Sequence, residues 1–72
     1  MSNFSDKLKQ LRNQKKAKQS DISTLLNIST RNYQRYEYGV NEPNIDGLIQ
    51  LADYFDVSLD YLVGRSDEPN RR

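Results

Sequence analysis

Apolar residues recur along this chain at the three- and four-residue spacing of amphipathic helices, and short polar turns separate the runs. The first run, with Phe4, Leu8 and Leu11, predicts a helix whose remaining positions are mostly polar or charged. Ser2 or Asn3 is expected to cap its start. No run shows the period-two alternation of a half-buried strand. The pattern therefore predicts an all-α domain.

Two short helices are expected next, separated by a tight turn. The first begins near residue 19, and its inward positions are Ile22, Leu25 and Leu26. Asn27 tolerates a left-handed backbone and is expected to end it. Ser29 then caps a helix that runs to about Tyr38, where Gly39 closes it.

Two further helices complete the predicted domain. Asn44 caps the fourth helix, whose inward positions are expected to be Ile45, Leu48, Ile49, Ala52 and Phe55. Gly47 inside this helix costs about 1 kcal/mol relative to alanine. Ser58 caps a last helix over residues 59–63, which Gly64 ends. We assign residues 1–65 to the domain and residues 66–72 to a flexible polar tail.

The composition excludes several classes of function. The chain has 72 residues, enough for one small domain, and contains neither cysteine nor histidine. Disulfides, thiolate metal sites and the commonest general base are therefore excluded. No apolar run approaches the roughly 20 residues that span a bilayer, and the first ten residues lack a signal-peptide pattern. We expect a cytoplasmic protein without enzymatic activity, cofactor, metal or membrane contact.

Charge is distributed unevenly along the chain, although the net charge is only +1. Residues 1–40 carry eight basic and three acidic side chains, a net charge of +5. Residues 41–72 carry three basic and seven acidic side chains, a net charge of −4. The front half is thus suited to phosphates while the back half faces away, although an ordinary mixed-charge surface is the alternative.

The third predicted helix has one inward and one outward face. Tyr33, Tyr36 and Glu37 cluster on the inward side, whereas Arg31 and Arg35 fall on the outward side. Tyr38 also falls on the outward side, Asn32 and Gln34 lie at its flanks, and Thr30 lies at the helix start. Arginine matches guanine edges in a major groove, amides match adenine, and threonine can contact thymine or phosphate. The face therefore predicts DNA reading, with a merely solvated helix face as the alternative.

The start of the second helix supports the DNA interpretation. Its free backbone amides suit a phosphate, and Gln19 and Lys18 lie at that point. Lys15 and Lys16 end the preceding helix, and Tyr38 can reach a phosphate with its hydroxyl. Two helices joined by a short turn match a helix-turn-helix, in which the first contacts the backbone and the second enters the groove.

Further anchors stand at fixed spacing: Gln19 opens the second helix, YEYG occupies residues 36–39, Glu42-Pro43 follows, and LADYFDVSLDYLVG covers residues 51–64. With these anchors, residues 4–64 resemble the helix-turn-helix domain of the Cro and phage-repressor type, also called the xenobiotic-response-element family. The resemblance implies a compact five-helix, lambda-repressor-like fold. It also implies a transcriptional regulator, here a repressor, that binds a two-fold DNA operator as a homodimer.

The resemblance also implies roles for individual residues. The residues expected to face base edges or nearby phosphates are Gln19, Thr30, Arg31, Asn32 and Arg35, with Gln34 on the groove wall. Lys18 and Asn41 are expected to contact the DNA backbone. Lys15, Lys16 and Tyr38 are the further phosphate contacts inferred above. Arg12 and Glu37 are expected to form a partly buried ion pair. The chain departs from the family at Lys18 (usually a serine or threonine cap), Ser23 (alanine), Asn27 (glycine) and Tyr33 (an aliphatic residue).

Other conspicuous residues have simpler interpretations. Asp53, Asp56 and Asp60 lack a calcium-binding loop and indicate a solvated acidic face. Leu59 and Leu62 are expected to close the core, while Val63 is left open as a dimer contact. The alternative function is a protein-interaction module, such as the antitoxin of a toxin–antitoxin pair, that uses the acidic half or the tail.

Overall fold

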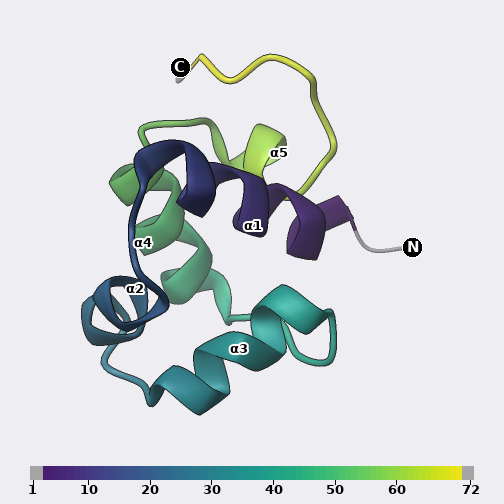
Figure 1. Cartoon of the computed structure of the whole chain (residues 1–72). Helices are drawn as coiled ribbons and strands as arrows, with labels where there is room; N and C mark the ends of the chain where they lie inside the picture. Colours follow the sequence, from purple (N-terminus) through teal and green to yellow (C-terminus); the bar gives the residue numbers. More distant parts are fainter. Residues whose placement is uncertain (1–2, 71–72) are drawn as a thin grey trace.

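The computed structural model of the protein describes residues 3–70. Its elements are α1 (Asn3–Lys15), α2 (Gln19–Leu25), α3 (Thr30–Tyr38), α4 (Ile45–Phe55) and α5 (Leu59–Leu62), as Figure 1 shows. Every regular element in residues 3–70 is an α-helix, which confirms the predicted fold class. Within the same range no helix has the length and apolar character to cross a membrane. The expected cap at Ser2 lies outside the described residues.

Three helices begin where the sequence places a side-chain cap. Ser29, Asn44 and Ser58 each accept a hydrogen bond from a backbone N–H three residues further on, at 3.0, 2.9 and 3.0 Å. Such a bond satisfies one of the amides that a helix start leaves without a partner. The cap residues therefore set the starts of α3, α4 and α5.

Left-handed residues end the helices or follow directly after them. Gly39 caps α3 with φ 79°, and Asn27 takes φ 57° in the turn after α2, as expected. Gly64 takes φ 84° after α5, which ends at Leu62, one residue before the predicted end. Asp56 caps α4 with φ 57°, a role that the sequence did not suggest.

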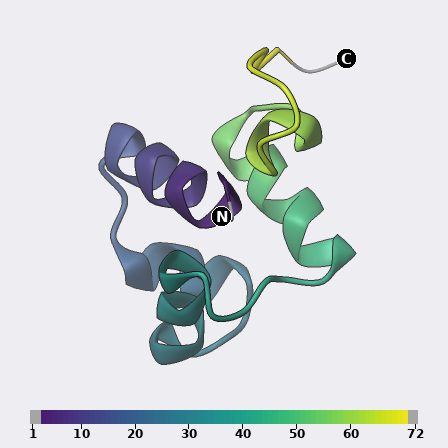
Figure 2. The ribbon, with the colours of Figure 1, turned by 90° about the vertical axis from the view of Figure 1, so that its right-hand side faces the viewer.

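The helices form two groups, one of α1, α2 and α3 and the other of α4 and α5. Figure 1 shows α2 and α3 below α1, with the tail at the opposite end of the molecule. Figure 2, turned by 90°, shows α4 and α5 beside the group formed by α1, α2 and α3. The whole measures 30 × 23 × 22 Å. Helix α3 consequently lies at one end of the molecule with one side open.

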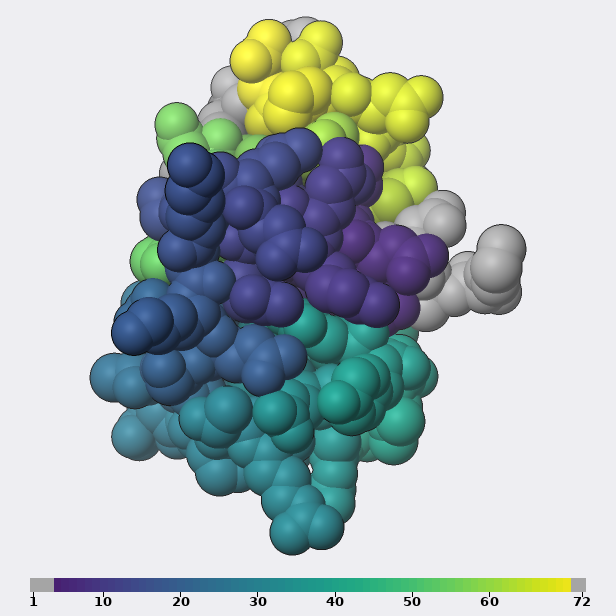
Figure 3. Space-filling view, in the orientation of Figure 1, coloured from purple at the N-terminus to yellow at the C-terminus, as the bar shows by residue number. Residues whose placement is uncertain are grey.

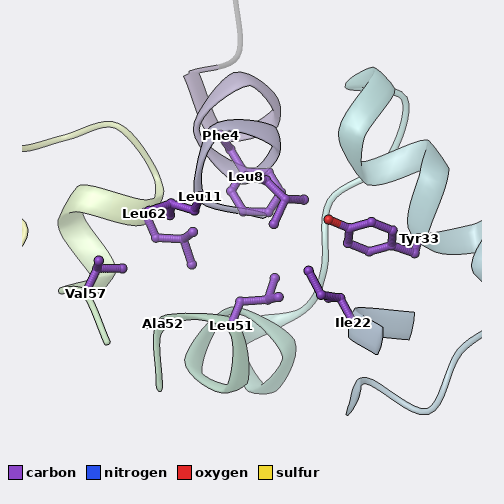
Figure 4. Packing of buried hydrophobic residues seen from close by; sticks show 9 residues of the cluster. All are labelled: Phe4, Leu8, Leu11, Ile22, Tyr33, Leu51, Ala52, Val57 and Leu62. Atoms are coloured by element: carbon purple, nitrogen blue, oxygen red, sulfur yellow. The ribbon is translucent and has the colours of Figure 1, made fainter. Parts of the chain in front are cut away.

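A single cluster of buried side chains joins all five helices (Figure 4). Its members are Phe4, Leu8, Leu11, Ile22, Tyr33, Leu51, Ala52, Val57 and Leu62. Tyr33, Leu8 and Ile22 are completely buried, so burial of α1, α2 and α3 against one another is continuous. Tyr33 enters from α3 with its hydroxyl toward the α1 side of the cluster. This hydrophobic burial is the main force holding the small domain together.

Two inward predictions for α4 are wrong. Ile45 and Ile49 are 65% and 45% exposed, whereas Leu51, which was not predicted, is completely buried. The buried side of α4 runs through Leu48, Leu51, Ala52 and Phe55, and α1 and α5 cover only that side. A helix with apolar residues around more than one face cannot bury them all in a domain of this size.

Residues 66–70 fold back onto the start of α5. The Ser58 N–H donates to the carbonyl of Pro69 at 2.9 Å, and the Ser58 hydroxyl donates to the carbonyl of Glu68 at 3.2 Å. Both bonds attach residues 66–70 to Ser58, the residue that caps α5. The assignment of residues 66–72 to a separate flexible tail stays a prediction.

Gly47 is expected to resist replacement although it lies inside α4. A Cβ atom there would stand 2.9 Å from Cβ of Pro43, whose ring is buried and rigid. We expect Gly47→Ala to lower the free energy of unfolding by about 1–2 kcal/mol. An open helix position would instead gain about 1 kcal/mol from alanine. Urea unfolding measures the change, with Gln50→Ala as the exposed control on the same helix. If Gly47→Ala were more stable than the wild type, Pro43 would have to shift to make room for the added Cβ atom.

Candidate nucleic-acid interface

The open side of α3 carries the side chains that were predicted to read bases. Arg31 and Arg35 are exposed and lie one turn apart, and Asn32 and Gln34 are half-buried beside them. Tyr38 at the end of the helix is 71% exposed. In the space-filling view of Figure 3, side chains of the α3 region project from the lower end of the molecule. The predicted base-reading side chains of α3 thus lie together at one end of the fold, while Gln19, the remaining one, lies at the start of α2.

Thr30 is less available than its neighbours. Its hydroxyl shares a hydrogen bond of 3.1 Å with the hydroxyl of Ser23, which is 3% exposed. Ser23 gives its own proton to the carbonyl of Ser20 at 3.1 Å, so Thr30 must be the donor to Ser23. Ser23 therefore ties the start of α3 to α2 through a buried hydroxyl pair.

The start of α2 obtains its cap from a different residue than the family pattern suggests. The N–H of Lys18 donates to the Asp21 carboxylate at 2.9 Å, so Asp21 reaches back to the residue before the helix. A carboxylate in the first turn is favourable beside the helix dipole. Lys18 itself is exposed next to this start. A phosphate at this end would lie close to both the Lys18 charge and the Asp21 charge.

The remaining candidates for phosphate contact lie at exposed positions. Lys15 and Lys16 are at the end of α1, and Asn41 is in the loop after α3. The ammonium of Lys15 stands 4.8 Å from the ring centroid of Tyr54, a cation–π distance. Lys16 has φ 58°, a left-handed backbone for a non-glycine residue. The Lys15 ammonium therefore contacts a side chain of α4, whereas Lys16 directly follows the last residue of α1.

The ion pair between Arg12 and Glu37 is present. Nε of Arg12 donates to Oε2 of Glu37 at 2.5 Å, and Nη2 donates to Oε1 at 3.2 Å. Nη1 of Arg12 also donates to the carbonyl of Ala17 at 3.1 Å. The pair therefore connects α1, the turn before α2 and α3. The Glu37 side chain is only 3% exposed, so this contact lies at the inner edge of the candidate interface.

Two further groups complete the surroundings of Glu37, and the sequence analysis did not foresee them. The Tyr33 hydroxyl donates to Oε2 at 2.5 Å, and Nε2 of Gln19 donates to Oε1 at 3.2 Å. With the two from Arg12, the buried carboxylate accepts four hydrogen bonds. The four-residue spacing of Tyr33 and Glu37 places both on the same side of α3 and could have indicated their contact.

Gln19 continues this network to the outward face. Its Oε1 accepts a hydrogen bond from Nε2 of Gln34 at 3.0 Å, so the Gln19 side chain bridges Glu37 and Gln34. We call Arg12, Tyr33, Glu37, Gln19 and Gln34 the Glu37 network. Gln19 and Gln34, both predicted to face DNA, are thus held by each other and by a buried charge.

The network holds Glu37 charged and Tyr33 protonated. Burial by itself raises the pKa of Glu37, but hydrogen bonds from Arg12, Tyr33 and Gln19 outweigh it and lower the pKa below the usual 4.5. Burial is also the main cause that raises the pKa of Tyr33, and the neighbouring Glu37 carboxylate adds to it. A charged acceptor surrounded by donors keeps one hydrogen-bond arrangement at neutral pH.

The sequence profile of the helix-turn-helix family matches residues 8–62. This chain belongs to the helix-turn-helix family. The match includes the whole of α2, α3 and the turn between them, which carry the candidate interface.

Two known proteins are similar to the chain over most of its length. The uncharacterised HTH-type transcriptional regulator YqaE of Bacillus subtilis is 44% identical over 90% of this chain and 57% of its own length. The transcriptional repressor RstR of the cryptic phage CTXphi in Vibrio cholerae is 36% identical over 76% of this chain and 52% of its own.

A solved structure agrees with the fold. The crystal structure of a transcriptional regulator from Listeria innocua matches with a TM-score of 0.86 and 38% identity, over 94% of this chain and 64% of that chain. The present chain spans between 48% and 60% of the length of the curated relatives that it matches.

The lowered pKa of Glu37 predicts a specific loss of stability in acid. A carboxyl group whose pKa is lowered by folding contributes stability that is fully present above its unfolded pKa and is lost as pH falls through the folded pKa. We expect the free energy of unfolding to decrease as pH falls below about 4.5. Glu37→Gln should show less of this decrease and should be less stable at pH 7 by roughly 3 kcal/mol.

Urea unfolding at a series of pH values tests this expectation. Glu42→Gln, at an exposed loop position, is the matched control and should keep the wild-type dependence on pH. The same acid slope in Glu37→Gln as in the wild type would place the responsible carboxyl elsewhere.

Proposed function

We propose that this protein is a sequence-specific DNA-binding transcriptional regulator, a repressor, that places α3 in the major groove of a two-fold operator as a homodimer. The observation that carries the proposal is the open face of α3, with exposed Arg31 and Arg35 on a helix fixed from behind by the Glu37 network. Membership of the helix-turn-helix family supports it. So do the relatives named as transcriptional regulators and as a phage repressor.

The dimensions of α3 suit the proposed role. The helix has nine residues, and an α-helix with its side chains is about 10–12 Å across. A B-DNA major groove is about 12 Å wide and admits a helix. Arg31 and Arg35 are the proposed guanine-reading residues, and Asn32 is the nearby amide. Each arginine can donate two hydrogen bonds to one guanine edge.

The proposed phosphate contacts lie before α2 and after the last turn of α3 along the chain. Lys16 and Lys18 stand before α2, whereas Tyr38 and Asn41 stand at the end of α3 and in the loop that follows. Contacts at both ends would fix the register of α3 along the duplex without reading sequence. The acidic half of the chain lies mainly in α4, α5 and the tail, and the tail is at the opposite end from α3 (Figure 1).

A groove of mixed apolar and acidic lining favours protein interaction as the second candidate function. Ile49 and Leu59, which are 45% and 38% exposed, line a cavity of about 530 Å³ beside α5. Acidic side chains line the same cavity: Asp53, Asp60 and Glu68. Two copies of the chain would bring these like charges together, so the groove suits a partner with basic and apolar side chains. A purified chain that ignores DNA and forms a stoichiometric complex broken by Ile49→Asp would favour this function.

Selection of bound duplex from a random library tests the DNA proposal most directly. The expected product is a two-fold sequence whose half-sites are centred about one helical turn apart, roughly 10 bp. A selection that returns no enriched sequence at low salt would contradict the proposal. Enrichment of a single half-site would contradict the homodimer.

Arg31 and Arg35 are expected to carry specificity. Arg31→Ala and Arg35→Ala should each lose about 1–3 kcal/mol of binding to the selected operator. Because both side chains are exposed, the urea midpoint should stay close to that of the wild type. Fluorescence anisotropy with labelled operator measures the affinity, and Arg65→Ala, exposed near the end of α5, is the control. Unchanged operator affinity in both variants would remove α3 from the contact.

Lys18 is expected to contribute affinity without specificity. Lys18→Ala should weaken binding to operator and to random DNA by the same factor and should reduce the slope of log K against log salt by about 1. The exposed Lys9 on α1 is the matched control, since it is outside the proposed contact set. A salt slope equal to that of the wild type would show that Lys18 touches no phosphate.

A further inference from the structure

The hydrogen bonds of the Glu37 network fix the orientation of the Gln19 amide. Its Nε2 lies 3.2 Å from a carboxylate oxygen of Glu37, and its Oε1 lies 3.0 Å from Nε2 of Gln34. A carboxylate accepts hydrogen bonds only, so the nitrogen of Gln19 and not its oxygen must face Glu37. The amide therefore has one stable orientation, with its oxygen toward Gln34.

The same bonds determine what Gln34 can offer to a ligand. Gln34 donates one N–H to Gln19, which leaves its carbonyl oxygen and its second N–H for other partners. An acceptor and a donor on one amide are what a bidentate contact with adenine N6 and N7 requires. Turning the Gln34 amide over to suit guanine would bring its oxygen against the oxygen of Gln19. The network thus favours adenine over guanine.

Gln19 is less free to contact a base itself. Turning its amide toward DNA would remove a donor from Glu37, a charge that is 3% exposed. A buried charge that loses a hydrogen-bond partner is costly. Gln34 has no bond to the buried carboxylate and can meet a base without that loss. The two glutamines therefore differ in role although both lie at the candidate interface.

Building on the proposed function, we infer that Gln34 reads an adenine in each half-site and that Gln19, held by the buried Tyr33–Glu37 pair, positions it. Tyr33 is a positioning residue, because its hydroxyl acts only through Glu37. The buried Tyr33 hydroxyl thus contributes to the preference for adenine without contacting the base.

The experiment uses the full chain and the operator obtained by selection. Affinities for operators carrying each of the four bases at every position are measured for the wild type and for Gln34→Ala, Gln19→Ala and Tyr33→Phe. The wild type should prefer adenine by about tenfold or more at one position in each half-site. Replacing that adenine by 7-deazaadenine, which lacks N7, should reproduce most of the loss.

The variants should all affect that same base position. Gln34→Ala should abolish the adenine preference, Gln19→Ala should reduce it strongly, and Tyr33→Phe should reduce it by about threefold. Affinity for random DNA should stay within about twofold of the wild type in all three. Gln50→Ala and Tyr61→Phe, which lie on α4 and α5, are the matched controls and should retain the full preference.

Three results would overturn the inference alone. The first is an adenine preference that survives Gln34→Ala, and the second is a Gln19→Ala effect at a different base position from that of Gln34→Ala. The third is a Tyr33→Phe variant that either keeps the full preference or weakens operator and random DNA equally. A chain that selects no sequence overturns the proposed function, and the inference falls with it.

A measurement on the free wild-type protein does not depend on the folding of any variant. The side-chain NH₂ groups of Gln19 and Gln34 should be rigid in ¹⁵N relaxation, whereas that of the exposed Gln50 should be mobile. Equal mobility of all three side chains would show that the network does not hold the amides, and would overturn the inference.

Discussion

The buried charge of Glu37 is the constraint on which the rest of this structure depends. A carboxylate with 3% exposure is tolerated only because donors surround it, and those donors come from α1, α2 and α3. Hydrophobic burial brings the three helices together, but it is not directional and does not by itself fix their relative positions and orientations. The directional bonds around one acceptor do so. The open face of α3 is therefore positioned from its buried side.

Sequence analysis predicted much of this fold because its signals are local. Cap residues and left-handed stops act on the neighbouring residues, so Ser29, Asn44, Ser58 and Gly39 marked helix ends from their own chemistry. The inward stripe of α1 was also clear, since only one of its faces is apolar. The exposure of Ile45 and Ile49 could not be predicted in this way. The side of α4 that is buried is the one that α1 and α5 pack against, and the number of apolar residues on each side does not decide it.

The candidate interface was predictable as a set of residues but not as a set of bonds. Helical spacing placed Arg31, Arg35 and Gln34 on one side of α3, and the family resemblance suggested the Arg12–Glu37 pair. The contacts of Gln19 depend on how α2 and α3 cross, which no local pattern specifies. A glutamine at the start of a helix looks the same in a sequence whether it faces solvent or bridges two other side chains. The structure distinguishes these cases.

The brevity of α5 has a consequence for the order in which the molecule opens. One helical turn has almost no intrinsic stability, so Leu59–Leu62 is held by the burial of Leu62 and by the two bonds from Ser58 to the returning tail. Amide protons in this corner should exchange with solvent through small local fluctuations. Exchange of the amide protons behind the Glu37 carboxylate requires the whole bundle to open. The α5 corner can therefore open locally while α3 keeps its shape.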